Sequence, residues 1–225
     1  MNKTYYIEES LSYIKGEQSL ENLISKFKPK LKLSVSGANL LPKKRFILIS
    51  NHPLTNPELF IPTKQIKNIR GGNKYGYNFF HFSVVQYILF QELLGSNFYV
   101  IANDIGWQEV LEEMSFIVVN PVNEVIKTRN IIVKAKKING NLIIFPEGGA
   151  KNQEVFQSGF LYIAKKLNIS HLVVAIMSPI PSLFKENFLK IIAIINIKKT
   201  RLKPTELTEK LRIFIIESLK KKIFL

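Results

Sequence analysis

The chain has 225 residues, 46% hydrophobic and 22% charged, which excludes a disordered polypeptide and allows one well-buried core. Its 32 Lys and Arg against 17 Asp and Glu leave a net charge of +15, which indicates a polyanionic partner: a nucleic acid, an anionic bilayer or a phosphorylated substrate. A lysine-rich composition without functional meaning is the other interpretation. The lack of cysteine excludes disulfides, thiolate zinc sites and a cysteine nucleophile.

Neither an export signal nor a transmembrane helix is predicted. The first twenty residues carry acidic and polar side chains where a signal peptide has its apolar run. The most apolar stretch, 79–101, is interrupted by His81, Gln86 and Glu92, so it falls short of the roughly 18 uncharged apolar residues that a spanning helix needs. We expect a cytoplasmic protein in which this stretch is either part of the core or lies in a bilayer interface.

Strand and helix patterns alternate along the first half of the chain. Residues 1–30 have the helical spacing of apolar side chains and stop at Pro29, which predicts an amphipathic helical lead-in. Residues 31–36 alternate as a strand does, and 46–49 form a short apolar run typical of a buried strand. Further elements are predicted as helices at 57–61 and 106–114 and as strands at 98–101 and 116–119.

The same alternation continues to the end of the chain. The predicted elements are helices at 124–138, 160–167 and 204–222, and strands at 142–145, 171–176 and 189–195. Such alternation is typical of an α/β fold with a mostly parallel central sheet flanked by helices. Since no internal repeat, linker or charge block divides the chain, we expect a single domain over residues 1–225.

His52 is the first candidate for chemistry, because it directly follows the predicted buried strand at 46–49. Ligand and catalytic sites of α/β folds gather at the carboxyl ends of strands. An imidazole with an ordinary pKa near 6.5 can take a proton from a hydroxyl at neutral pH. The alternative is a loop histidine that only caps a turn.

A second polar cluster, FPEGGAKN at 145–152, follows another predicted strand. Its adjacent glycines, Gly148 and Gly149, let a backbone approach a ligand closely and turn N–H groups toward an anion. An ordinary strand-to-helix turn is the alternative.

Taken together, four segments resemble the glycerolipid acyltransferase family, which includes the 1-acylglycerol-3-phosphate and lysophospholipid acyltransferases. In chain order they are GANLLPKKRFILISNHP at 37–53, IGW at 105–107 with FIVVNP at 116–121, FPEGG at 145–149, and FQSGFLYIAKKLNISHLVVAIMSP at 156–179. The resemblance covers roughly residues 30–220 and implies the acyltransferase-like α/β fold.

The resemblance also implies an activity: acyl transfer from the thioester of acyl-CoA or acyl carrier protein to the hydroxyl of a lysolipid or glycerol-phosphate-like acceptor. His52 would deprotonate that hydroxyl, and Asn51, Glu147 and the backbone of Gly148 and Gly149 would shape the acceptor site. Direct attack of this kind needs a base and an oxyanion stabiliser but no enzyme nucleophile. We therefore expect no metal and no cofactor beyond the thioester co-substrate.

Two departures from the family pattern affect the candidate site. Pro57 stands where the family has an aspartate that orients the histidine, so Glu58 with its longer side chain, or else Asn56, would support His52, unless both are ordinary helix-start residues. A neutral partner can cost about four orders of magnitude in rate.

The second departure is at the arginines that bind the acceptor's phosphate in many relatives. Asn120 and Ala150 occupy those positions, and Lys151 replaces an arginine only as a point charge. The acceptor is therefore expected among lysolipids, aminolipids or other hydroxylated lipids.

The expected partner is a membrane lipid surface, on the inner face of which the protein would lie peripherally. Lys127, Arg129, Lys134, Lys136 and Lys137 fall on the predicted helix at 124–138, where they either attract an anionic leaflet or form a solvated face. A catalytically silent lipid-binding homologue is the second hypothesis. Nucleic-acid binding, indicated by charge alone, is not expected, because the chain lacks a recognisable binding module.

Overall fold

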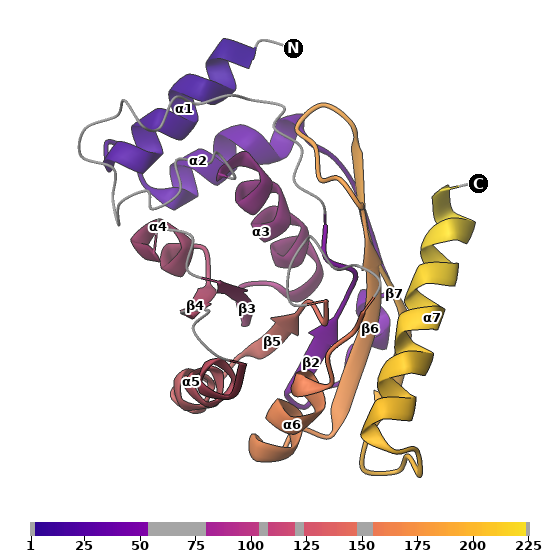
Figure 1. The fold of residues 1–225 in the computed structure, drawn as a ribbon. Helices are drawn as coiled ribbons and strands as arrows, with labels where there is room; N and C mark the ends of the chain where they lie inside the picture. Colours follow the sequence, from indigo (N-terminus) through magenta and orange to yellow (C-terminus); the bar gives the residue numbers. More distant parts are fainter. Residues whose placement is uncertain (1–2, 54–79, 104–107, 120–123, 148–154, 224–225) are drawn as a thin grey trace.

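The computed structural model describes residues 3–53, 80–103, 108–119, 124–147 and 155–223 (Figure 1). Its strands are β1 (Lys32–Ser36), β2 (Phe46–Ile49), β3 (Phe98–Asn103), β4 (Phe116–Val119), β5 (Asn141–Ile144), β6 (His171–Met177) and β7 (Glu186–Asn196). Its helices are α1 (Lys3–Lys15), α2 (Leu20–Phe27), α3 (Phe80–Leu94), α4 (Gln108–Glu113), α5 (Glu124–Lys136), α6 (Gly159–Lys166) and α7 (Pro204–Ile223), with short 3-10 turns η1 (Lys28–Lys30) and η2 (Ala38–Leu40).

All seven strands form one sheet in the order β1-β7-β6-β2-β5-β3-β4. Every neighbouring pair is parallel except β6 and β7, which are antiparallel. The α/β class and the mostly parallel central sheet are thereby confirmed. The predicted strands agree with the observed ones to within a few residues, and the predicted helix at 57–61 lies outside the described residues.

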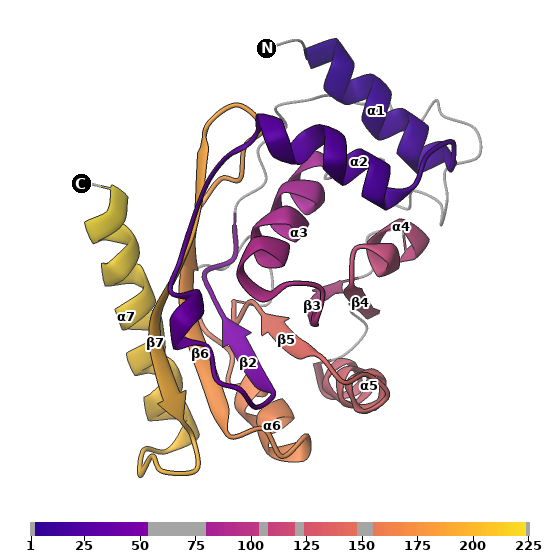
Figure 2. The same ribbon diagram turned by 180° about the vertical axis from the view of Figure 1, so that it is seen from behind.

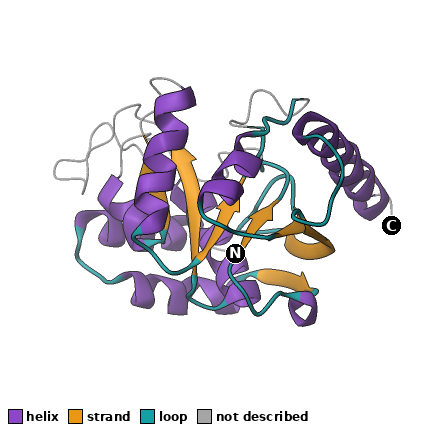
Figure 3. Ribbon diagram, turned by 90° about the horizontal axis from the view of Figure 1, so that it is seen from below, coloured by secondary structure: helices purple, strands orange, loops and turns teal. Residues whose placement is uncertain are grey.

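Helices cover both faces of the sheet (Figures 1 and 2). Seen from below, they lie on either side of the strands (Figure 3). One face packs against α1 to α4 and the other against α5 to α7. In β2, Phe46 and Leu48 enter the first core while Ile47 and Ile49 enter the second. A strand buried on both faces needs apolar side chains on both, which explains the unbroken run at 46–49.

The helical lead-in and the apolar stretch that begins at residue 79 belong to the core. In α3 the side chains from Ser83 to Phe90 are all buried. Leu23 and Phe27 of α2 are fully buried in the same cluster. These segments were expected either to pack in the core or to lie in a bilayer interface. Their described residues pack in the core. Within those residues we find no helix both long and apolar enough to cross a membrane.

Gly37 links β1 to the turn before β2 and has a conformation that a side chain would disturb. Its φ is +91°, and an added Cβ would lie 2.7 Å from Cβ of Ile191 in β7. We expect Gly37→Ala to lower the free energy of unfolding by about 2 kcal/mol, because left-handed strain and overpacking add. Gly95 is the matched control: its φ is +68°, but nothing lies within 4 Å of the added Cβ. Equal losses for both variants in urea unfolding would contradict this explanation.

Candidate functional site

The candidate site lies where the central strands end. Since β2 is parallel to both β5 and β6, the three strands end at the same edge of the sheet. Beyond that edge the chain continues from β2 to α3 on one face, and from β5 to α6 on the other. Ligands of open α/β sheets bind where neighbouring strands send their connections to opposite faces in this way. The segments after β2 and β5 carry His52 and Glu147 to this position.

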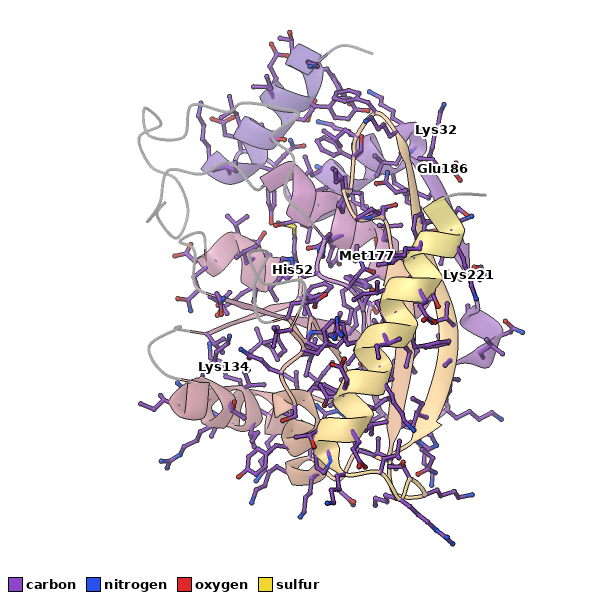
Figure 4. All side chains as sticks on the ribbon, turned by 45° about the vertical axis from the view of Figure 1, so that its right-hand side comes forward. Lys32, His52, Lys134, Met177, Glu186 and Lys221 are labelled. Atoms are coloured by element: carbon purple, nitrogen blue, oxygen red, sulfur yellow. The ribbon has the colours of Figure 1, made fainter. Side chains whose placement is uncertain are left out.

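Asn51 fixes the segment after β2 to the end of β6. Its Nδ2 donates to the carbonyl oxygen of Met177 at 3.1 Å, and its Oδ1 accepts from the N–H of Met177 at 2.9 Å. The side chain is 6% exposed, and Oδ1 also lies 3.2 Å from Oγ of Ser50. This amide ties the segment after β2 to the last residue of β6, so in the structure Asn51 positions the residue that follows it. Figure 4 shows His52 and Met177 close together.

Asn51→Ala is expected to lower the free energy of unfolding by about 2 kcal/mol, since the N–H and C=O of Met177 would stay buried without their partner. Ser50→Ala is the control, because Ser50 has a single contact to the same amide. Urea unfolding would measure both. A loss for Asn51→Ala no greater than that for Ser50→Ala would show that the two bonds to Met177 contribute little.

The orientation of the His52 ring follows from its hydrogen bond. Nδ1 lies 2.8 Å from the carbonyl oxygen of Pro53. A carbonyl oxygen can only accept, so this contact requires the proton on Nδ1 and leaves the lone pair of the neutral ring on Nε2. The ring packs edge-on against Phe145, which follows β5, with 5.0 Å between the ring centroids. Nε2 therefore has the acceptor character that a general base needs.

Burial favours the neutral form of His52. Removal of the ring from water lowers the pKa of His52 below its ordinary value of 6.5, and the hydrogen bond to Pro53 offsets part of this effect. At neutral pH the imidazole is thus unprotonated and ready to accept a proton.

Glu147 joins the segment after β5 to the segment after β2. Its Oε1 accepts the backbone N–H of His52 at 2.9 Å, while Oε2 is buried and has no hydrogen-bond partner among the described residues. The residue is 5% exposed. Burial raises the pKa of Glu147 to about 7, although the hydrogen bonds that the carboxyl group accepts from backbone N–H groups lower the pKa in part. Near neutrality this carboxyl group can be either an acid or a carboxylate.

Three of the residues proposed from the sequence therefore lie together: Asn51, His52 and Glu147. The others are outside the described residues: Asn56, Glu58, Asn120, Gly148, Gly149 and Lys151. Sequence reasoning missed Met177 as the partner of Asn51 and Phe145 as the wall beside His52. Phe145 was visible as the first letter of the FPEGG segment, whereas nothing near Met177 in the sequence points to Asn51.

The arrangement combines a neutral, partly buried imidazole with a buried carboxyl group of raised pKa at one edge of the sheet. Such a pair of environments is typical of sites that move protons. Among the described residues, no cluster of three or more His, Cys, Asp or Glu could hold a metal ion.

Comparison with known proteins gives a structural likeness. No protein-family model matches the chain, and no curated protein matches it. Among solved structures it is similar to the 1-acyl-sn-glycerophosphate (LPA) acyltransferase PlsC from Thermotoga maritima, with 16% identity and a TM-score of 0.49. The similarity covers 98% of this chain and 79% of that one. A likeness at this level leaves the family undecided, so the function has to be inferred from the residues of the site.

Proposed function

We propose that the protein is an O-acyltransferase that moves a fatty acyl group from acyl-CoA or acyl carrier protein to a hydroxyl of a lysolipid or glycerol-phosphate-like acceptor at a membrane surface. The observation that carries the proposal is the His52 ring, whose Nδ1 donates to Pro53 while Nε2 remains the acceptor at the carboxyl edge of the sheet. In this role Nε2 takes the proton of the acceptor hydroxyl, and the resulting alkoxide attacks the thioester carbonyl carbon. The thiolate of the donor then leaves and takes the proton from Nε2, which gives a free thiol and the neutral imidazole again, so no acyl-enzyme forms.

Glu147 has a supporting role in this reaction. Its bond to the His52 backbone holds the base in place, and its second oxygen, Oε2, is buried beside that bond. The four sequence segments that resemble the glycerolipid acyltransferases agree with this assignment. The missing arginines favour an acceptor other than glycerol phosphate, such as a lysolipid.

A catalytically silent lipid-binding homologue is the alternative. It is favoured by Pro57 at the expected aspartate position, because a neutral carbonyl such as that of Pro53 stabilises the imidazolium of a working base less than a carboxylate does. Turnover distinguishes the two hypotheses.

The proposal is tested by thioester consumption. Purified protein would be mixed with acyl-CoA or acyl-loaded acyl carrier protein and with lysolipid, aminolipid and glycerol-phosphate acceptors in turn. Acceptor-dependent release of free thiol supports the enzyme and identifies the acceptor class. If no donor–acceptor pair gives thiol release but the protein binds lysolipid, the silent homologue would be supported.

The pH dependence of kcat/KM should reflect the titration of His52. Protonation of Nε2 removes the base, so kcat/KM falls as pH falls through the pKa of His52, which burial places below 6.5. Rates measured between pH 5 and 8 with the Glu147→Gln variant isolate this effect, since that variant lacks the carboxyl group that titrates near 7. A half-maximal point above 6.5 in the variant would be inconsistent with a buried, neutral base.

A further inference from the structure

The two helical layers that cover the sheet differ in charge. Helices α5, α6 and α7 carry eleven Lys and Arg against four Glu, a net charge of +7. Helices α1 to α4 carry three Lys against seven Glu, a net charge of −4. The positive charge of the helices is therefore concentrated on one side of the molecule, and an anionic surface would attract that side.

The basic layer also exposes apolar side chains to solvent. Ile126 and Val133 of α5 and Tyr162 of α6 are 52%, 49% and 51% exposed, and Ile213 and Phe214 of α7 are exposed as well. None of the large hydrophobic residues found exposed in the described part of the chain belongs to α1, α2, α3 or α4. Exposed apolar groups and positive charge thus coincide on the same layer.

The spacing of these residues places them on the outside of their helices. Ile126, Arg129, Val133 and Lys136 follow each other at three- and four-residue steps, so they form one stripe along α5. On α6, Tyr162 is followed by Lys165 and Lys166 at the same spacing, and Nζ of Lys166 lies 5.3 Å from the Tyr162 ring.

The opposite sides of both helices are buried in the core. Ile131 and Ala135 of α5 and Phe160 and Ile163 of α6 pack in the cluster beneath the helices. Since α5 and α6 contact each other on the same side of the sheet, both stripes belong to the same layer.

We propose that this surface, the outer face of α5, α6 and α7, docks on an anionic phospholipid bilayer. The inference rests on the proposed function for the choice of a bilayer as the partner, and it assigns the contact to particular residues. Aliphatic side chains and a tyrosine would enter the headgroup region, while the lysines meet lipid phosphates. A nucleic acid fits this face less well, because three of its five exposed apolar side chains, Ile126, Val133 and Ile213, have no ring to stack on a base, and nine of the eleven cations are Lys.

The segment that follows the candidate site also leads to this layer. A single layer of helices, about 10 Å thick, separates the sheet from the outer face. The chain passes from the site after β5 to the start of α6, where Val155 is also exposed. His52 itself packs against Phe145, which contacts Phe90 of α3, so its ring lies toward the side of the sheet that α1 to α4 cover. Figure 4 shows Lys134 on α5 and Lys221 on α7, two cations of this layer.

The test is flotation of the full chain with vesicles of phosphatidylcholine alone or mixed with phosphatidylglycerol. The basic variant is Lys136→Gln/Lys165→Gln/Lys166→Gln, and the apolar variant is Ile126→Ser/Val133→Ser/Tyr162→Ser. The matched control, Lys3→Gln/Lys15→Gln/Lys28→Gln, removes the same charge from the other layer at exposed positions. Thermal unfolding confirms that each variant folds.

We expect binding only to vesicles that contain phosphatidylglycerol. Each lysine near an anionic leaflet contributes about fivefold in affinity, so the basic variant should bind on the order of a hundredfold more weakly while the control binds nearly as well as wild type. The apolar variant should also bind more weakly. Equal losses for the basic variant and the control, wild-type binding by the apolar variant, or binding to a DNA duplex but not to vesicles would each overturn the proposal. Because binding is measured without turnover, His52→Ala should bind as wild type does, and a failure of the proposed chemistry would leave this result unchanged.

Discussion

Replacing His52 by alanine is expected to lower kcat/KM for acyl transfer by about a thousandfold, within the range that a positioned general base contributes. The reason is the position of Nε2, which accepts the proton of the acceptor hydroxyl in the proposed reaction while Nδ1 is held by Pro53. The measurement is acceptor-dependent thiol release, compared at equal concentrations of folded protein.

His171→Ala is the matched control for this variant. His171 begins β6, at the opposite end of the strand from Met177, and its Nδ1 lies 3.0 Å from Oγ of Ser170. It should keep the wild-type rate. If both variants lost activity equally, the loss would reflect the fold rather than the base, and a fully active His52→Ala would remove His52 from the mechanism.

Glu147→Gln is expected to change the pH dependence of stability. In the folded protein the pKa of Glu147 is raised to about 7, so the folded state holds a proton that the unfolded state releases near 4.5. This contribution to stability is complete below pH 4.5 and is lost as pH rises through 7. Relative to the Gln variant, which does not titrate, wild type should lose about 3 kcal/mol of unfolding free energy between pH 4.5 and 8.

Urea unfolding at several pH values measures this difference directly. The titration of His52 acts in the opposite direction, since its lowered pKa costs stability as pH falls, but it occurs in both proteins and largely cancels in the comparison. A difference between wild type and Glu147→Gln that stays constant with pH would contradict the raised pKa of Glu147.

Local patterns made most of the fold predictable. The apolar run at 46–49 marks β2 because both of its faces are buried, and the four-residue repeat of Leu207, Leu211 and Ile215 marks the buried side of α7. Strand direction and order were harder to predict. Alternation within a strand does not show that β7 runs antiparallel to β6, or that β6 lies next to β2. The pattern of an amphipathic helix is the same whether its apolar side faces a protein core or a bilayer. The burial of Phe27 in the core therefore could not be predicted from the sequence.

The candidate site was predictable in part for the same reason. His52 and Glu147 each follow a strand, and the order of the four family-like segments indicated that they act together. Their actual contact, between the Glu147 carboxyl group and the backbone of His52, depends on β2 and β5 being neighbours. The bond between Asn51 and Met177 joins residues 126 positions apart, and no local pattern reports such a pairing.

Acyl transfer with His52 as the base has a defined product, the acylated acceptor. Wild type, His52→Ala and His171→Ala would each be incubated with an acyl thioester and the acceptor found in the thiol-release experiment, and the acceptor would be analysed by mass spectrometry. We expect an acyl ester on the acceptor hydroxyl with wild type and His171→Ala and only a trace with His52→Ala. Equal ester formation by His52→Ala would show that His52 is not the base.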